Sequence, residues 1–173
     1  MYYVVLYLLA IVVANVTVAI FGAVASIVNA FLFIGLDLTA RDKLHEAWSG
    51  RGLWLKMVAL IVAGAALSWG LNRTAGPIAF ASMMAFGAAA TVDAVIYQAL
   101  GGYPKWLRVN GSNIPAAAVD SLLFPALAFG MPLLWPVVLG QFVAKVAGGA
   151  VWAIILGRFY AISGTSSNDP ASV

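Results

Sequence analysis

The sequence predicts an all-α integral membrane protein, a bundle of six transmembrane helices with cytoplasmic N- and C-termini. First, 64% of the 173 residues are apolar or aromatic and only 9% are charged, whereas a soluble domain is nearer half apolar and a quarter charged. Second, uncharged runs of the roughly 20 residues that one membrane span needs recur along the chain. Third, the basic residues gather in alternate connections between these runs.

Turn residues and charged stretches separate the apolar runs. The first run follows Met1 without the basic segment and cleavage site of a secretory signal, so we expect it to be retained. Gly22 separates it from the second run, and the stretch 41–52, which holds five charged residues, must be aqueous. The predicted domain covers 1–162, followed by a disordered polar tail over 163–173, with spans at about 2–21, 23–40, 53–71, 78–100, 114–133 and 135–156.

The basic residues predict the orientation. Six spans put both termini on one side of the membrane, together with the second-to-third and fourth-to-fifth connections, and cytoplasmic loops carry an excess of Lys and Arg. The opposite side receives only Arg73. The predicted location is therefore the cytoplasmic (inner) membrane, with the lipid bilayer as a partner and with these residues inside: Arg41, Lys43, Arg51, Lys56, Lys105, Arg108 and Arg158.

The composition excludes several classes of function. The chain has no Cys and one histidine, His45, so neither a disulfide framework nor a zinc or haem cluster can be assembled. The nine basic residues form no patch or arm, so a nucleic-acid partner is not expected either. We predict that the protein needs no cofactor and no metal.

Polar side chains inside the predicted spans are the candidate functional residues, because an ionisable group there costs a few kcal/mol on insertion scales. Asp93 and Asp120 are expected at one depth, in the cytoplasmic half of spans four and five. Lys145 lies in the middle of span six. The full set is Asp37, Asp93, Asp120 and Lys145, with the neutral Asn15 and Gln141.

Structural roles for these residues remain open. Asp37 and Arg41, four residues apart, could form an interfacial ion pair, and Lys145 could extend its amine to the membrane surface. Either Asp93 or Asp120 could be hydrogen-bonded between helices. Gln141 lies four residues from Lys145, so these two side chains share a helix face.

Four segments resemble the queuosine precursor transporters, also called the vitamin uptake transporter family. The segment FLFIGLDLTARDKL resembles the second-span signature, in which an apolar run ends in Asp-Leu-Thr-x-Arg. In the same order follow ASMMAFGAAATVDAVIYQAL, KWLRVNGSNIPAAAVDSLLFPALAF and QFVAKVAGG. The resemblance covers about residues 15–149. The chain departs from the family pattern in its short loops and in the ending WAIILGRFYAI.

This resemblance implies import of a 7-deazaguanine, such as 7-cyano-7-deazaguanine or its aminomethyl relative, for nucleic-acid modification. The chemistry is compatible, because a carboxylate can accept both N–H groups of a guanine-like edge while its carbonyl oxygen needs a donor. Aromatic side chains could cover the flat ring. The candidate substrate-binding residues are Asn15, Asp37, Arg41, Asp93, Asp120, Ser121, Phe124, Gln141 and Lys145.

The sequence also leaves functions other than import open. One alternative is the substrate-binding subunit of an energy-coupling-factor type vitamin importer, and another is a non-transporting scaffold or a holin-like protein. An enzyme is not expected: DLTAR is similar to the start of the CDP-alcohol phosphotransferase signature, but the Gly after Asp and the later paired aspartates are missing. The sequence leaves open a homo-oligomer or an ATPase module as further partners.

Overall fold

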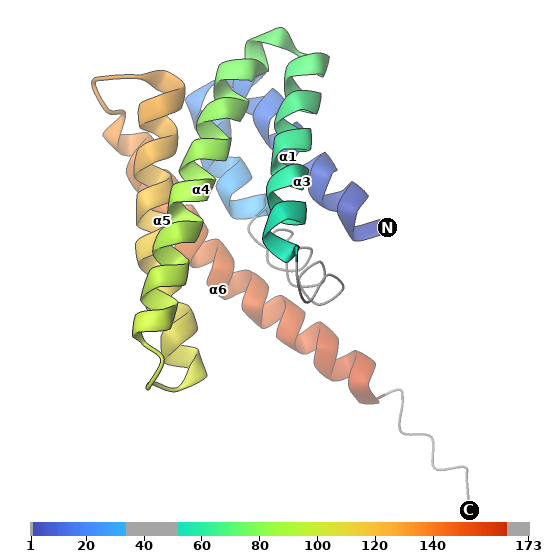
Figure 1. Ribbon diagram of the computed structural model, residues 1–173, viewed down its shortest axis with the longest axis vertical. Helices are drawn as coiled ribbons and strands as arrows, with labels where there is room; N and C mark the ends of the chain where they lie inside the picture. Colours follow the sequence, from blue (N-terminus) through green and yellow to red (C-terminus); the bar gives the residue numbers. More distant parts are fainter. Residues whose placement is uncertain (1, 34–51, 166–173) are drawn as a thin grey trace, which may run out of the picture.

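The computed structural model describes residues 2–33 and 52–165, and each secondary-structure element in these ranges is helical (Figure 1). Two short connections, at Gly22 and at residues 100–104, join helices that run back alongside each other. The elements are α1 (Tyr2–Phe21), the Ala23–Phe33 helix, α3 (Leu53–Leu71), the 3-10 helix η1 (Arg73–Ala75), α4 (Gly76–Ala99), α5 (Lys105–Phe129) and α6 (Trp135–Thr165).

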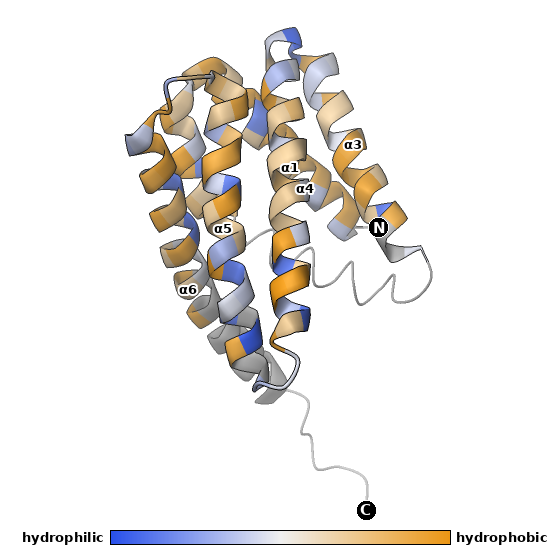
Figure 2. Cartoon of the chain, turned by 60° about the vertical axis from the view of Figure 1, so that its left-hand side comes forward, coloured by the Kyte–Doolittle hydropathy of each residue, from blue (hydrophilic) through white to orange (hydrophobic). Residues whose placement is uncertain are grey.

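The helices have the apolar surface of a membrane protein. Three segments are long and apolar enough to cross a bilayer, Tyr3–Phe21, Arg73–Ala99 and Asn110–Phe129. Three shorter apolar helices accompany them, Ala23–Phe33, Leu55–Leu71 and Trp135–Val151. Figure 2 shows apolar residues along the lengths of the helices, with hydrophilic positions scattered among them. The all-helical, apolar class is thus confirmed, whereas the six-span count and the cytoplasmic termini stay predictions.

The helix boundaries agree with the predicted spans at the N-terminal end and differ at the C-terminal end. Helices α1 and α3 begin and end where the predicted spans do. Helix α5 begins at Lys105 and not at 114, directly after Pro104, whose fixed φ suits a helix start. It ends at Phe129 and not at 133, because Gly130 takes a left-handed φ of 79° that stops the helix.

Helix α6 continues to Thr165, nine residues beyond the predicted end at 156. The first residues of the predicted disordered tail, 163–165, are therefore helical, because the apolar run of α6 carries on through Tyr160, Ala161 and Ile162 without a breaker. The rest of that tail, 166–173, and the end of the predicted second span lie outside the described residues.

Small residues let the helices approach closely. Helix α4 packs along α5, α1 packs against α3, and α6 lies diagonally against α5 (Figure 1). A Cβ atom at Gly64 of α3 would lie 2.7 Å from Cγ2 of Ile11 in α1. A Cβ atom at Gly140 of α6 would lie 2.7 Å from Cδ1 of Ile27. These two contacts join α1 to α3 and α6 to the Ala23–Phe33 helix.

Candidate substrate site

An ion pair joins two helices in the interior. Lys145 of α6 donates to Oδ2 of Asp120 in α5, and the two side chains keep only 14% and 24% of their surface exposed. The same amine lies 3.3 Å from Oγ of Ser121 and 3.5 Å from Oε1 of Gln141. Lys145 is therefore held between helices by three oxygens and does not extend to the membrane surface.

Gln141 links this ion pair to a third helix. It is 2% exposed, and its Nε2 donates to Oγ of Ser26 over 2.8 Å. Ser26 in turn donates to the carbonyl oxygen of Ala23. Because the amide nitrogen of Gln141 is used by Ser26, its Oε1 is directed to Lys145. The predicted common face of Gln141 and Lys145 is thus confirmed.

Pro125 loosens α5 next to the ion pair. A proline has no N–H, so helix α5 cannot form the usual hydrogen bond from residue 125 to the carbonyl oxygen of Ser121. Both Pro125 and Ser121 are fully buried. The ion pair therefore lies in a turn of α5 where the backbone bonding is incomplete.

The ion pair forms part of the wall of an inner cavity of about 200 Å³. The wall combines flat aromatic side chains, uncharged polar side chains and the two charges, so it can contact both the faces and the edge of a planar polar molecule. The aromatic members are Tyr7, Phe33 and Phe86, the uncharged polar members are Asn15, Asn29 and Ser82, and the charged members are Asp120 and Lys145.

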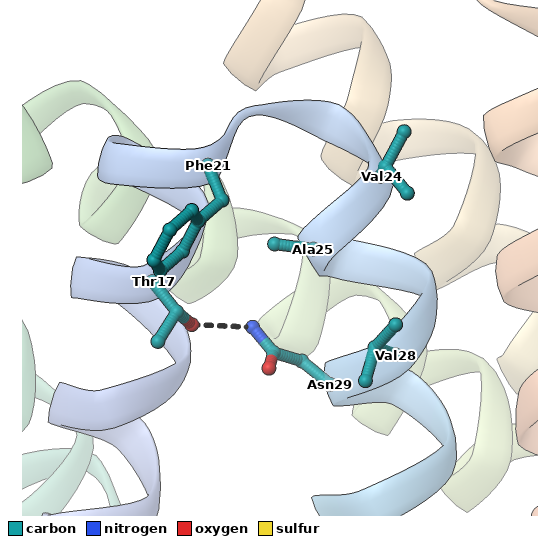
Figure 3. A pocket seen from close by; sticks show the side chains of 6 residues that line it. All are labelled: Thr17, Phe21, Val24, Ala25, Val28 and Asn29. Carbon is teal, nitrogen blue, oxygen red and sulfur yellow. Dashed lines mark hydrogen bonds between the residues drawn. The ribbon is translucent and has the colours of Figure 1, made fainter.

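A second hollow lies beside the first, between α1 and the Ala23–Phe33 helix (Figure 3). It measures about 340 Å³ and is open. Asn29 lies between the two hollows and belongs to both walls. The outer hollow has almost entirely apolar walls and no charged side chain, so the inner cavity is the candidate substrate site. The outer wall consists of Thr17, Phe21, Val24, Ala25, Val28 and Asn29.

Four of the nine candidate residues predicted from the sequence are outside the cavity wall but within the described residues. Ser121 and Gln141 lie behind the wall, where they contact Lys145. The ring of Phe124 packs edge-on against Phe129, with centroids 5.9 Å apart. Asp93 does not line the cavity. Asn15, Asp120 and Lys145 line it, and Asp37 and Arg41 lie outside the described residues.

The expected common depth of Asp93 and Asp120 is wrong. Asp93 lies six residues before the end of α4, whereas Asp120 lies fifteen residues after the start of α5. At about 1.5 Å of rise per residue, their distances from the α4–α5 connection are about 9 Å and about 22 Å. The error arises because residues 105–113, taken as a loop, form the first turns of α5.

The sequence reasoning missed Asn29, Ser82 and the three aromatic side chains of the wall. Asn29 could have been found, because it is a polar residue in the apolar run VASIVNAFLF, as Asn15 is in its own run. Tyr7, Phe33 and Phe86 gave no such signal, since aromatic residues are common on every face of a membrane helix. Within the described part of the chain no group of three metal-binding side chains occurs.

One comparison with known proteins identifies the chain. The family described as "Putative vitamin uptake transporter" matches residues 3–159, which is nearly the whole sequence. No curated protein and no solved structure matches the chain. The family match agrees with the resemblance of the four sequence segments and with the apolar, multi-pass character of the helices. The chain therefore belongs to the vitamin uptake transporter family of membrane proteins.

Proposed function

We propose that this transporter imports a 7-deazaguanine, namely 7-cyano-7-deazaguanine or its aminomethyl relative, across the cytoplasmic membrane. The observation that carries the proposal is the Asp120–Lys145 ion pair in the wall of a cavity of about 200 Å³. Such a cavity is below the usual range for drug-sized ligands, and it suits a single small base better than a nucleoside.

The ion pair offers the two kinds of group that a guanine-like edge needs. Asp120 accepts from the ring N–H and the exocyclic amine, and Lys145 donates to the ring carbonyl oxygen. Without ligand the two side chains satisfy each other. Binding then exchanges one set of charge-assisted hydrogen bonds for another and leaves neither charged group without a hydrogen-bond partner.

The residues around the ion pair supply the other contacts that this exchange of hydrogen bonds needs. Ser121 and Gln141 continue to accept hydrogen bonds from the Lys145 amine when Asp120 binds the ligand. The rings of Tyr7, Phe33 and Phe86 can cover the two faces of the base. Charged groups inside a membrane bundle are retained for substrates or ions, which fits a binding role better than a scaffold role.

The proposal includes six spans with both termini in the cytoplasm. The three long apolar helices and the three shorter ones would each cross once. In this orientation Arg73 is the single basic residue outside, where its guanidinium lies 4.1 Å over the ring of Trp69. An Arg–Trp stack is well placed at a membrane–water interface.

The decisive experiment is uptake of labelled precursor by cells that can neither make nor import it. Cells that express the chain should accumulate label and recover the modified tRNA, with the exposed variant Thr91→Ala equal to the parent. Cells expressing Asp120→Ala should accumulate none at a matched protein level. Uptake with and without an uncoupler separates proton-driven from facilitated import. If the parent chain neither binds nor accumulates either precursor, the proposed import is refuted. A scaffold role would then be the remaining alternative.

A further inference from the structure

Two amide side chains of the cavity wall have their orientation set by backbone carbonyl groups. Nδ2 of Asn29 donates to the carbonyl oxygen of Ala14 over 3.1 Å and to Oγ1 of Thr17 over 2.8 Å. A carbonyl oxygen can only accept, so the nitrogen of Asn29 must be on that side. The oxygen Oδ1 of Asn29 is therefore on the other side of the amide, turned away from Thr17 in Figure 3.

Asn15 is oriented by the same kind of chain of bonds. Its Nδ2 donates to Oγ of Ser68 over 3.1 Å, and the Ser68 hydroxyl donates to the carbonyl oxygen of Gly64 over 2.7 Å. Since the single hydrogen of Ser68 is used by Gly64, Ser68 must accept from Asn15, which again fixes the amide nitrogen. Oδ1 of Asn15 is left without a donor among the described residues.

Both asparagines line the cavity. Among the described residues, Asp93 Oδ1 is the one fully enclosed side-chain oxygen or nitrogen that has no hydrogen-bond partner. Oδ1 of Asn15 is therefore not fully enclosed, although Asn15 as a whole is only 4% exposed, and Asn15 is part of the cavity wall. Asn29 lines the same cavity, and its Nδ2 bonds to the residue before Asn15.

We propose that Asn15 and Asn29 form an acceptor subsite of the cavity that selects a ligand bearing a primary amine over its nitrile counterpart. The inference rests on the proposed deazaguanine substrate and names the preferred one. An aminomethyl group donates up to three N–H bonds, whereas a nitrile nitrogen can only accept and would face two acceptor oxygens.

The surroundings of the subsite also favour a cation. Phe33 follows Asn29 by four residues, so the two share a helix face, and Tyr7 and Phe86 belong to the same wall. An ammonium group gains from aromatic faces as well as from amide oxygens. Asp120 and Lys145 together add no net charge that would repel it.

The test compares the two ligands on the purified full chain by titration calorimetry. We expect the aminomethyl base to bind at least about tenfold more tightly than the cyano base, the difference that a charge-assisted hydrogen bond makes. This comparison needs no variant. Equal affinities, or tighter binding of the cyano base, would overturn the subsite while leaving the proposed function intact. Failure of both bases to bind would overturn both.

Variants then assign the preference to the amide oxygens. Asn29→Ala and Asn15→Ala should each weaken binding of the aminomethyl base about tenfold and change binding of the cyano base by less than about twofold. The matched controls Thr17→Val and Ser68→Ala each remove the side-chain hydroxyl that accepts from an amide nitrogen, but they keep both amide oxygens and the Ala14 carbonyl partner of Asn29. They should retain the preference. If the controls lose it as fully as the asparagine variants do, the asparagines only join helices and the subsite is refuted.

Discussion

Asp120 and Asp93 have similar neighbours in the sequence but different environments in the fold. Each follows a Val and precedes a small residue and two aliphatic residues. Asp120 pairs with Lys145 and faces the cavity. Asp93 is outside the cavity, and its Oδ1 is enclosed without a hydrogen-bond partner in the described part of the structure. The environment of a carboxylate in a membrane helix thus depends on which side chain of a neighbouring helix packs against it, here Lys145 of α6 against Asp120.

Arg108, a cation on α5, contacts Tyr97 and not Asp93. Arg108 lies in the first turn of α5, but its guanidinium is 4.0 Å over the ring of Tyr97, and its Nε donates to the carbonyl oxygen of Tyr97 over 3.3 Å. Tyr97 is one helical turn beyond Asp93. Arg108 therefore holds the end of α4 against α5, whereas Lys145 pairs with Asp120 in the wall of the cavity.

The largest effect is expected from Lys145→Met, which removes the cation of the buried pair and keeps the side-chain length. An unpaired buried charge costs several kcal/mol, and because the pair keeps 14% and 24% exposure we expect about 3 kcal/mol of lost stability. Uptake should disappear. Thermal unfolding of the purified chain in detergent measures the lost stability. Accumulation of labelled precursor measures uptake.

The double variant Asp120→Asn with Lys145→Met separates stability from function. It leaves no charge unpaired, so most of the lost unfolding free energy should return, as it does when buried ion pairs are replaced by neutral groups. Uptake should stay absent. A double variant as unstable as Lys145→Met alone would mean that the two side chains do not depend on each other.

The sequence predicted the helical class. It also drew attention to Asp120, Lys145 and Asn15, which line the cavity, because polar residues in apolar runs are conspicuous. It could not predict which of Asp93 and Asp120 pairs with Lys145, since that depends on where α5 begins and on how α6 crosses it. The stretch 105–113 contains Asn110, Gly111 and Asn113, residues typical of loops, yet packing against α4 keeps it helical. Contacts between distant segments, such as Asn29 with Ala14, have no signature in a single sequence.

A smaller effect should distinguish the two carboxylates directly. Asp120→Asn turns one acceptor oxygen toward the ligand into a donor, which should weaken binding about 5- to 150-fold, or about 1 to 3 kcal/mol. Asp93→Asn should change ligand affinity by less than about twofold. It should change the stability of the fold by no more than about 1 kcal/mol, since an amide at this place still has an enclosed polar atom without a partner. Equal losses of affinity in the two variants would mean that Asp93 contacts the ligand as Asp120 does.

A still smaller effect is expected from Gln141→Leu, which tests whether the hydrogen bond from Lys145 to Gln141 contributes to ligand binding. The change removes the 2.8 Å bond to Ser26 and the oxygen facing Lys145. We expect a loss of about 1 to 2 kcal/mol of stability and a weakening of ligand binding by less than about tenfold. Ser26→Ala is the matched control, because it breaks the same bond and leaves the Gln141 oxygen on Lys145. It should lower stability and keep the affinity.

The smallest effect should come from Phe124→Leu. The ring of Phe124 lies against Phe129 at an interplanar angle of 86°, and Phe124 is not part of the cavity wall. Losing an edge-to-face pair costs about 0.5 to 1.5 kcal/mol of stability, and uptake should match the parent once expression is equal. The paired variant Phe86→Leu removes a ring that does line the cavity. It should raise the Kd for the base several-fold with a similar change in stability. Since both substitutions remove the same atoms from membrane helices, the difference in Kd isolates contact with the substrate. If Phe124→Leu raises the Kd and Phe86→Leu does not, the flat face of the base lies against α5 and the assigned cavity is the wrong one.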